Sequence, residues 1–519
     1  MLPKLIAHYL PQFHRIPEND AWWGDGFTEW SAVKAAVPLF EGHRQPRVPL
    51  DNNYYDLSDI ETLKWQAELA RKYGIYGLSF YHYWFKDGKQ VLEKPAEMLL
   101  NDKTIDMPFC FNWANQTWAR TWSKLVEDAQ NVWAGTFEEK GKKNENKQGI
   151  LLEQKYGDRK DWIAHIRYLL PFFKDPRYIR LNNRPVFVLF QPDKIYCLSD
   201  MMECWNEELK KEGIPGIYLI GESFGQEYFD IPELSAWLMR SPNYSMSAEG
   251  KKNIGSLMCY DYDKMWEKLL DYQPDSVLKK KKYLCAMLDY DSTPRKGKNG
   301  EVILGVDSSK FKGYFDRLIK KHENLNNEYL FINAWNEWGE GMYLEPDSEH
   351  GYDYLESIKY VMDKYSKDAF GVYQNEYVHS GIVDEDEEKN RLKCRLYLVG
   401  RERLLLSRWL NIYNVTHRLE EYLLDRGYKN IAVYGLGVSG KNLIGKLSHT
   451  RVLVNYVIDR NPSIDYAGLS LYGLEDKWPE IDVVIVTPVA RYGDIKESIR
   501  KYHSEVRTIS LEHIIYELE

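Results

Sequence analysis

The sequence lacks several features that define other classes of protein. None of its 519 residues lies in an apolar run near the ~18 residues of a membrane span. The N-terminus shows no apolar segment followed by a cleavage site, so we expect a cytoplasmic protein. The six cysteines lie far apart without a Cys-x-x-Cys pair, which argues against a disulfide framework and a zinc site. Lys and Arg number 69 against 78 Asp and Glu, and a net charge of −9 indicates no nucleic-acid surface.

Aromatic residues, in contrast, are abundant. The chain has 17 Trp and 39 Tyr, and 15 of the tryptophans precede residue 366. A large core accounts for many of them, because aromatic side chains bury the most apolar area. We also expect a few to line a groove in which sugar rings stack. The candidates are Trp23, Trp30, Trp84, Trp113, Trp118 and Trp122.

Residues 1–365 alternate apolar, strand-like runs with helical patterns, which predicts an α/β fold. Eight strands are expected, at Lys4–Tyr9, Gly77–Tyr83, Pro108–Trp113, Pro185–Phe190, Gly216–Gly221, Ala236–Met239, Tyr283–Leu288 and Tyr329–Ala334. Helical patterns between them are Asp59–Tyr73, Asp161–Phe173, Met201–Glu212, Tyr262–Asp271 and Ser309–His322. Eight strands alternating with helices predict a (β/α)8 barrel of the TIM type.

Two further parts are expected after the barrel. Residues 366–428 hold a charged run at Val383–Arg391 and then apolar positions at helical spacing, which predicts a linker with connecting helices. Peripheral association of these helices with a membrane surface stays open. Residues 429–519 predict a small Rossmann-like α/β domain, with strands at Lys429–Tyr434, Val452–Ile458 and Asp482–Val486.

A Gly-x-Gly-x-x-Gly loop follows the first strand of that last domain. It comprises Gly435, Gly437 and Gly440, and Asp459 ends the next strand. In dinucleotide-binding folds such a loop approaches the pyrophosphate and such an acid binds the ribose. The domain is only about half a dinucleotide fold. Two interpretations stay open, nucleotide or nucleotide-sugar binding and a structural or docking role.

Polar and aromatic residues cluster where the expected barrel strands end, which is where barrels build active sites. They include His8, Tyr9, His82, Tyr83, Trp84, Trp113, Asn115, Asp291, Asn333, Trp335, Asn336 and Trp338. A histidine at such a position either bonds sugar hydroxyls or serves the structure, and both interpretations are kept.

Glu337 and Glu340 form the strongest candidate pair. They follow the last expected strand, three residues apart, among tryptophans and glycines. Glycoside chemistry needs one carboxylic acid to protonate a leaving oxygen and a second carboxylate as nucleophile or base. Neighbouring indoles desolvate a carboxyl and raise its pKa, so it can hold a proton near neutrality. The competing interpretation is two solvated loop glutamates.

Two Asp-x-Asp pairs match the signature of metal-dependent nucleotide-sugar transferases. They are Asp261 with Asp263 and Asp289 with Asp291. Such pairs arise readily by chance in an acidic chain. We expect no metal and no cofactor.

Several motifs together resemble the WbsX-type glycosyltransferases over about residues 4–365. They are Tyr9-Leu10-Pro11-Gln12-Phe13-His14, Gly26-Phe27-Thr28-Glu29-Trp30, Tyr81-His82-Tyr83-Trp84-Phe85, Trp113-Ala114-Asn115, Trp335-Asn336-Glu337-Trp338 with Glu340-Gly341, and Leu344-Glu345-Pro346-Asp347. The resemblance implies a glycosyltransferase of O-antigen or capsule biosynthesis, with a barrel similar to glycoside hydrolase family 99, the endo-α-mannosidases.

The resemblance also implies roles for particular residues. Glu337 would deprotonate a sugar 2-hydroxyl, giving retention through a 1,2-anhydro intermediate, and Glu340 would be the acid/base. Glu29, Trp30, Asp291 and Arg295 would join the strand-end residues in binding substrate. The chain has Ser292 where relatives usually carry Asn, which is a departure from the family pattern.

The partner implied is a carbohydrate, either a free or a lipid-linked glycan, together with a nucleotide-sugar donor if the reaction is transfer. The alternative functions are an endo-α-glycosidase and a non-catalytic glycan-binding protein.

Overall fold

The computed structural model describes residues 2–119, 150–224, 231–246, 250–273, 280–325, 327–368, 402–459 and 468–518. The chain divides into two compact units. The first comprises Met1–Pro192, Cys204–Glu227 and Leu234–Val378, and the second Asp193–Glu203, Tyr228–Glu233 and His379–Glu519.

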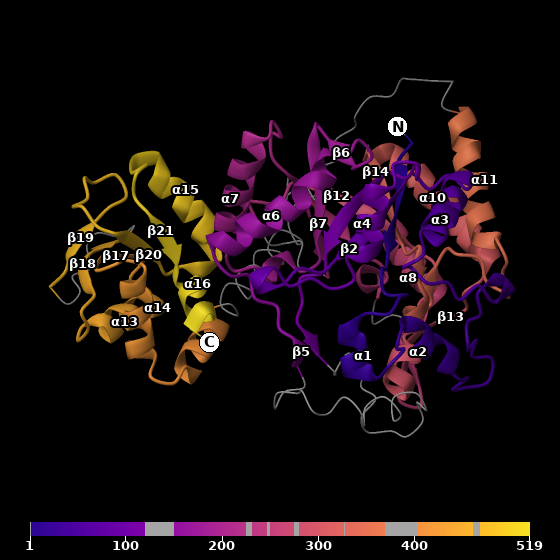
Figure 1. Ribbon diagram of the computed structural model, residues 1–519, viewed down its shortest axis with the longest axis horizontal. Coiled ribbons are helices and arrows are strands. Elements are labelled where there is room, and N and C mark those ends of the chain that lie inside the picture. The colour runs from indigo at the N-terminus through magenta and orange to yellow at the C-terminus, as the bar shows by residue number, and fades with distance from the viewer. Residues whose placement is uncertain are drawn as a thin grey trace. The chain divides into compact units, whose positions relative to one another are not determined.

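The first unit is a closed barrel of eight parallel strands (Figure 1). In order around the barrel they are β1 (Lys4–Tyr9), β2 (Gly77–His82), β3 (Phe109–Trp113), β7 (Arg184–Leu189), β8 (Tyr218–Ser223), β9 (Ala236–Met239), β12 (Lys281–Met287) and β14 (Tyr329–Asn333). Pairing of β3 with β7 and of β1 with β14 completes the ring, and β6 (Arg180–Leu181) adds to β7 antiparallel. Parallel strands covered on both faces are predominantly apolar, which made them visible in the sequence. The predicted TIM-type barrel is confirmed.

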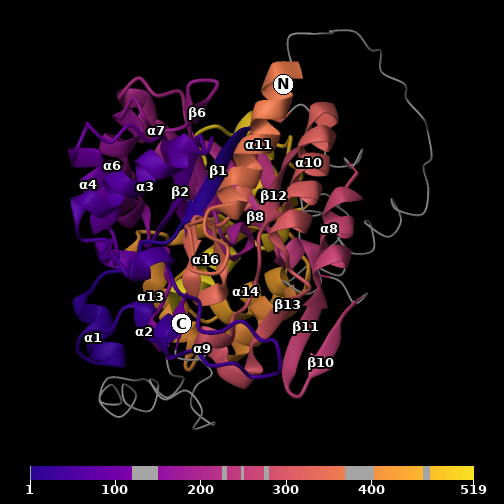
Figure 2. The ribbon, with the colours of Figure 1, turned by 90° about the vertical axis from the view of Figure 1, so that its right-hand side faces the viewer.

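Helices surround the strands (Figure 2). They are α3 (Ile60–Lys72), α4 (Lys94–Asn101), α6 (Arg159–Lys174), α7 (Leu198–Lys211), α8 (Tyr262–Leu270), α10 (Ser308–Leu325) and α11 (Asp353–Asp368). Asp59 caps α3 by accepting a hydrogen bond from the Glu61 amide, and Asp158 caps α6 in the same way. Helix α3 buries Leu63, Ala67 and Ala70, one stripe at helical spacing. None of the described helices is long and apolar enough to cross a membrane.

Short elements decorate the barrel and were not predicted. They are α1 (Pro17–Trp23), α2 (Glu29–Ala35), β4 (Trp118–Ala119), β5 (Ile150–Leu152), β10 (Lys252–Ile254), β11 (Leu257–Asp261), α9 (Thr293–Lys296), β13 (Glu301–Leu304), β15 (Asn336–Glu337), η8 (Trp338–Glu340) and β16 (Met342–Tyr343). Elements of two to seven residues carry too little periodicity to be read from a sequence.

The second unit contains a five-stranded parallel sheet in the order β19-β18-β17-β20-β21. Its elements are α13 (Val415–Asp425), β17 (Asn430–Tyr434), α14 (Val438–Leu447), β18 (Leu453–Ile458), β19 (Ser470–Tyr472), β20 (Val483–Val486), α15 (Tyr492–Tyr502), β21 (Thr508–Ser510) and α16 (Leu511–Leu518). Residues 402–411 form a further helix, whereas the charged run Val383–Arg391 lies outside the described residues.

Both faces of this sheet are covered. Ile431 and Val433 of β17 pack into one cluster with α13, α14 and α16, and Ala432 and Tyr434 pack into another with α15. The alternation follows from the period of two along a strand. The predicted small α/β fold is confirmed, with two more strands than were expected.

Candidate active site

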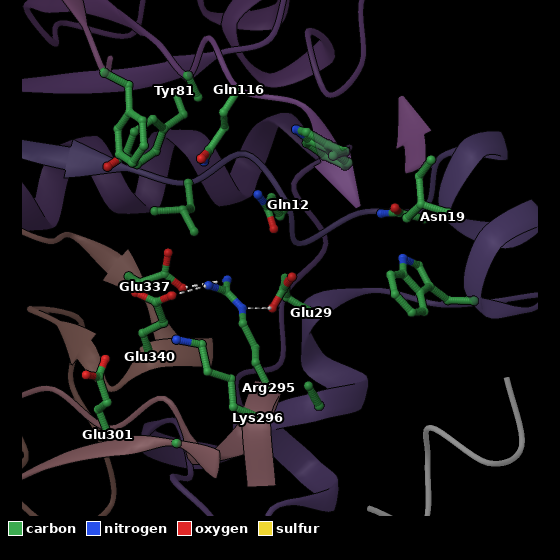
Figure 3. Close-up of a pocket in the computed structure, with 18 of the residues that line it drawn as sticks. Gln12, Asn19, Glu29, Tyr81, Gln116, Arg295, Lys296, Glu301, Glu337 and Glu340 are labelled. Atoms are coloured by element: carbon green, nitrogen blue, oxygen red, sulfur yellow. Dashed lines mark hydrogen bonds and ion pairs between the residues drawn. The ribbon is translucent and has the colours of Figure 1, made fainter. Parts of the chain in front are cut away.

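A cavity of about 920 Å³ lies at the carboxyl ends of the barrel strands. Its volume is near the upper end of the range for small-molecule sites. Its polar and aromatic lining includes Gln12, Asn19, Trp23, Glu29, Tyr81, Tyr83, Gln116, Trp118, Phe190, Arg240, Arg295, Lys296, Glu301, Glu337 and Glu340. Figure 3 shows many of these side chains pointing into one space.

The two glutamates of the candidate pair lie on the hairpin that follows β14. Asn336 fixes this hairpin to the end of β1: its Oδ1 accepts from the Leu10 amide at 2.8 Å, and its Nδ2 donates to the Leu10 carbonyl at 3.0 Å. Gly341 ends the turn at φ 68°, in the left-handed region that favours glycine. The side chains of Glu337 and Glu340 thereby line the cavity (Figure 3).

Arg295, in α9, joins three carboxylates. Its Nη2 donates to Glu337 Oε1 at 2.8 Å, and its Nη1 donates to Glu340 Oε1 at 2.9 Å. Its Nε donates to Oε2 of Glu29, the first residue of α2, at 3.1 Å. Burial opposes the positive charge of Arg295, but the three carboxylates outweigh it and raise the pKa of the guanidinium. Arg295 therefore stays a cation among three acids.

Each of the paired glutamates keeps one oxygen for a ligand. The Oε1 atoms of Glu337 and Glu340 bond Arg295, whereas their Oε2 atoms accept no hydrogen bond from any described residue. Burial raises the pKa of Glu337 well above its ordinary value; Arg295 opposes the rise, and the charges of Glu340 and Glu29 add to it. A carboxyl in this environment can take up and release a proton during a reaction.

Glu345 is a buried carboxyl that supports the hairpin. Its carboxylate accepts hydrogen bonds from Tyr55 Oη at 2.8 Å, Trp338 Nε1 at 2.7 Å and Gln66 Nε2 at 2.7 Å. Burial raises the pKa of Glu345 to about 7, although these donors oppose the rise. The carboxylate thus fixes the indole next to Glu337.

Some of the predicted substrate-binding residues reach the cavity and most do not. The cavity is lined by Glu29, Tyr83, Trp118 and Arg295, and by the stacking candidate Trp23. The other predicted residues are buried and are not among its lining residues: His8, Tyr9, Trp30, His82, Trp84, Trp113, Asn115, Asp291, Asn333, Trp335, Asn336 and Trp338. Trp122 lies outside the described residues.

Several buried members of this set have hydrogen-bond or stacking partners within the protein. Trp84 stacks on His165, with ring centroids 4.5 Å apart, and its carbonyl accepts from Trp113 Nε1 at 3.1 Å. Tyr9 Oη donates to Gln66 at 2.7 Å. Most tryptophans of the barrel therefore serve its core, and the described stacking candidates that face the cavity are Trp23 and Trp118.

Several residues at this end of the barrel were not among the predicted site residues, among them Gln12, Tyr81, Glu222 and Arg240. Tyr81 and Arg240 line the cavity, and so does Gln12, whose Nε2 donates to Tyr83 Oη at 2.8 Å. Glu222 is buried behind Arg240 and accepts from its Nη1 at 2.7 Å. The sequence did indicate three of these residues, because Tyr81, Glu222 and Arg240 are polar residues at or just after the ends of barrel strands.

The Asp-x-Asp pairs are engaged by protein groups. Asp261 caps α8, and Asp263 accepts from Lys310 and Tyr314. Asp289 accepts from Arg47 at 2.7 Å, and Asp291 bonds His43, Gln45 and Thr293. In the described parts of the chain, no group of three or more His, Cys, Asp or Glu side chains is arranged to hold a metal ion.

The glycine loop of the second unit packs against its own backbone. A Cβ added to Gly440 would overlap the carbonyl oxygen of Gly435, whereas one added to Gly437 would meet no atom within 4 Å. Asp459 Oδ2 accepts from the Leu436 amide at 2.8 Å, so the acid holds the loop. These contacts account structurally for Gly440 and Asp459, and nucleotide binding by Gly435, Gly437, Gly440 and Asp459 stays a prediction.

Paired carboxyls in a cavity at the carboxyl ends of a TIM-type barrel are the arrangement of a carbohydrate-active enzyme. The family model described as Glycosyltransferase WbsX matches residues 5–358. The chain belongs to the WbsX glycosyltransferase family, and the resemblance seen in its motifs is confirmed.

Curated relatives and solved structures are also similar to this chain. The uncharacterized protein WxcX of Xanthomonas campestris pv. campestris is 32% identical over 369 residues, which cover 69% of this chain and 50% of the relative. The chain thus spans about half the length of the curated relatives it matches.

Among solved structures, the GH99 endo-alpha-mannosidase from Bacteroides thetaiotaomicron is 14% identical, with a TM-score of 0.43, covering 71% of this chain and 98% of that one. A glycoside hydrolase-like protein is 12% identical, with a TM-score of 0.44, covering 70% and 94%. These likenesses assign no residue and no substrate to this chain.

Proposed function

We propose that this protein is a retaining glycosyltransferase that acts on α-linked sugars in the assembly of a bacterial surface polysaccharide, such as O-antigen or capsule. One observation carries the proposal: Glu337 and Glu340 are each tied to Arg295 through one oxygen, and their second oxygens are free at the cavity. Membership of the WbsX family supports glycosyl transfer as the reaction.

In the proposed first step, Glu337 Oε2 accepts the proton of the sugar 2-hydroxyl. O2 then forms a bond to C1 while the bond from C1 to the leaving oxygen breaks. Glu340 supplies the proton that the leaving oxygen takes. The product of this step is a 1,2-anhydro sugar with a protonated Glu337 and an ionised Glu340.

The second step reverses these proton movements. The acceptor hydroxyl attacks C1, Glu340 takes its proton, and O2 recovers its proton from Glu337 as the C1–O2 bond opens. Two inversions at C1 give net retention. Both carboxyls end in their starting states.

The two carboxyls differ in exposure, and the first step requires Glu337 to be ionised although its raised pKa favours the protonated form. The side chain of Glu337 is 7% exposed and that of Glu340 is 23% exposed. The deeper carboxyl, with its raised pKa, is the stronger base once ionised. The more open carboxyl is better placed to meet leaving and incoming groups that change during the reaction.

The test incubates the protein with nucleotide-sugars plus α-linked oligosaccharide acceptors, and separately with the oligosaccharides alone, and follows products by mass spectrometry. We expect a lengthened oligosaccharide and release of the nucleotide only in the first mixture. Shortened oligosaccharides in the second mixture would instead assign an α-glycosidase. Binding without any product would assign a glycan-binding protein.

Variants of the two glutamates test whether these residues carry out the proton transfers. Glu337→Gln and Glu340→Gln keep the size and shape of each side chain and remove its ability to exchange a proton, so we expect turnover to fall by at least about 10²-fold. Glu356→Gln changes an exposed glutamate of α11 and controls for the change of net charge. Wild-type turnover in Glu340→Gln would overturn the proposal.

A further inference from the structure

Arg240 lies at the Tyr81 end of the cavity and is held from three sides. It follows β9 and is 9% exposed. Its guanidinium carbon lies 4.9 Å from the centre of the Phe190 ring and 5.8 Å from that of Phe224. Its Nη1 donates to Glu222 at 2.7 Å and to Tyr81 Oη at 2.6 Å. These contacts fix the plane of the guanidinium before any ligand arrives.

Three of the five N–H donors of this guanidinium bond no described residue. A guanidinium has five N–H donors, and the Nε and Nη2 donors of Arg240 bond no described residue. Tyr81 Oη accepts from Arg240 and donates to no described residue, and burial raises its pKa, so it keeps its proton. Arg240 and Tyr81 both line the cavity.

The residues that support Arg240 leave its Nε and Nη2 donors without a partner among the described residues. Glu222 is fully buried and takes its second hydrogen bond from Asn112 Nδ2. His8 lies 3.8 Å from Glu222, and burial, together with the charge of Arg240, lowers its pKa and keeps it neutral. Glu222 is therefore the single described carboxylate paired with Arg240, and it uses only Nη1.

We propose that Arg240 and Tyr81 form a subsite for an anionic group on the sugar, a carboxylate or a phosphate. The planar fork of an arginine matches both groups through two parallel N–H bonds. Arg240 and Glu337 line the same cavity, so an anion on Arg240 belongs to the reacting sugar or to the group attached to it. A hexuronic acid supplies the carboxylate, and a nucleotide-sugar supplies the phosphate.

This inference rests on the proposed function, since it takes the occupant of the cavity to be a sugar. The test measures binding and needs no turnover. The subsite can therefore fail while the proposed function stands, and the proposed function can fail while the subsite stands. It uses the full chain carrying Glu340→Gln. The probes are the methyl α-glycosides of glucuronic, galacturonic and mannuronic acid, the matching neutral hexosides, inorganic phosphate, and uridine diphosphate, titrated by calorimetry and ligand-observed NMR.

We expect at least one acidic glycoside to bind about ten-fold more tightly than its neutral partner, or phosphate and uridine diphosphate to bind where the neutral hexosides do not. The first result identifies an acidic sugar and the second a donor phosphate. The preference should vanish in Arg240→Gln and weaken in Tyr81→Phe. Equal binding of acidic and neutral probes in every arm overturns the subsite.

Three further variants keep the test decisive. Arg240→Gln leaves Glu222 buried without its partner, which threatens folding, so the double variant Glu222→Gln/Arg240→Gln is measured beside it. Arg167→Gln, an exposed arginine of α6, controls for the lost charge. Lys296→Gln removes another cation of the cavity lining and should retain the preference; loss of the preference in Lys296→Gln, with Arg240→Gln unaffected, would overturn the assignment to Arg240.

Discussion

Gly339 lies so close to Arg295 that a Cβ added to it would be 2.8 Å from Arg295 Nε and 2.8 Å from Glu29 Oε2. No real Cβ contact is that short, so the ion pair between Arg295 and Glu29 requires glycine at this position. We predict that Gly339→Ala displaces the guanidinium and lowers turnover at least ten-fold, which initial-rate measurements will show.

The matched control is Gly313→Ala in α10, where the added methyl group meets no atom within 4 Å. It should leave turnover unchanged and stabilise the helix by about 0.5–1 kcal/mol. Equal rates in the two variants would contradict the prediction.

Replacing Arg295 should move the pH profile. Arg295 lowers the pKa of Glu337 against the effect of burial. Without the guanidinium the pKa of Glu337 rises further, so a higher pH is needed to ionise the proposed base. Arg295→Gln should shift the acidic limb of the rate profile to higher pH, and Arg295→Lys should shift it less. An acidic limb that stays at the wild-type pH would show that Arg295 does not lower the pKa of Glu337.

Glu345 should make stability fall with rising pH. Its pKa is about 7 in the folded protein and near 4.5 in an unfolded chain, so between these values the folded state holds a proton that the unfolded state has released. The contribution of Glu345 to the free energy of unfolding is fully present below about pH 4.5. It is lost as the pH rises through about 7, by up to about 3 kcal/mol. Glu345→Gln removes this part of the slope, which thermal unfolding between pH 5 and 8 will measure.

The exposed Glu356→Gln should unfold with the wild-type pH dependence and so controls for the substitution itself. Parallel curves for wild type and Glu345→Gln would show that Glu345 is ionised throughout.

Trp23 and Trp338 should respond differently to truncation. Trp23 is half-buried and lines the cavity, so Trp23→Ala should weaken glycan binding about ten-fold with little effect on stability. Trp338 is fully buried and stacks on Tyr343 at 3.7 Å, so Trp338→Ala should cost about 3–5 kcal/mol. Calorimetric titration checks glycan binding, and denaturant unfolding checks stability. A loss of stability in Trp23→Ala with weakened binding in Trp338→Ala would instead place Trp23 in the core and Trp338 at the glycan.

The glycine loop of the second unit offers a pair of variants in one turn. Gly440→Ala drives a methyl group into the Gly435 carbonyl and should destabilise the second unit by about 1–3 kcal/mol. Gly437→Ala has free space and should not. Hydrogen exchange of the full chain localises the effect to β17 and α14. If Gly437→Ala alone abolished binding of a nucleotide, the loop would be a nucleotide site.

The fold was predictable because most residues of the barrel strands are apolar. Strands such as β12 and β14 bury nearly every residue, and a run of that kind between helical patterns indicates a βα unit. The site was predictable in part, since Glu337, Glu340 and Arg295 follow strand ends. The side-chain direction was not: Tyr83 faces the cavity while its neighbour Trp84 faces the core. Side chains of neighbouring residues in an extended segment point to opposite sides. The composition of the sequence does not indicate which of the two faces the cavity.

The ring of charges around Arg295 draws on distant parts of the chain. Glu29 precedes the second strand of the barrel, whereas Glu337 and Glu340 follow the last one, β14. A nascent chain that has not yet released β14 from the ribosome holds Arg295 and Glu29 without their two partners. Synthesis therefore reaches the final barrel strand before Glu337 and Glu340 can join Glu29 around Arg295, and a chain cut short within the barrel lacks this cluster of charges.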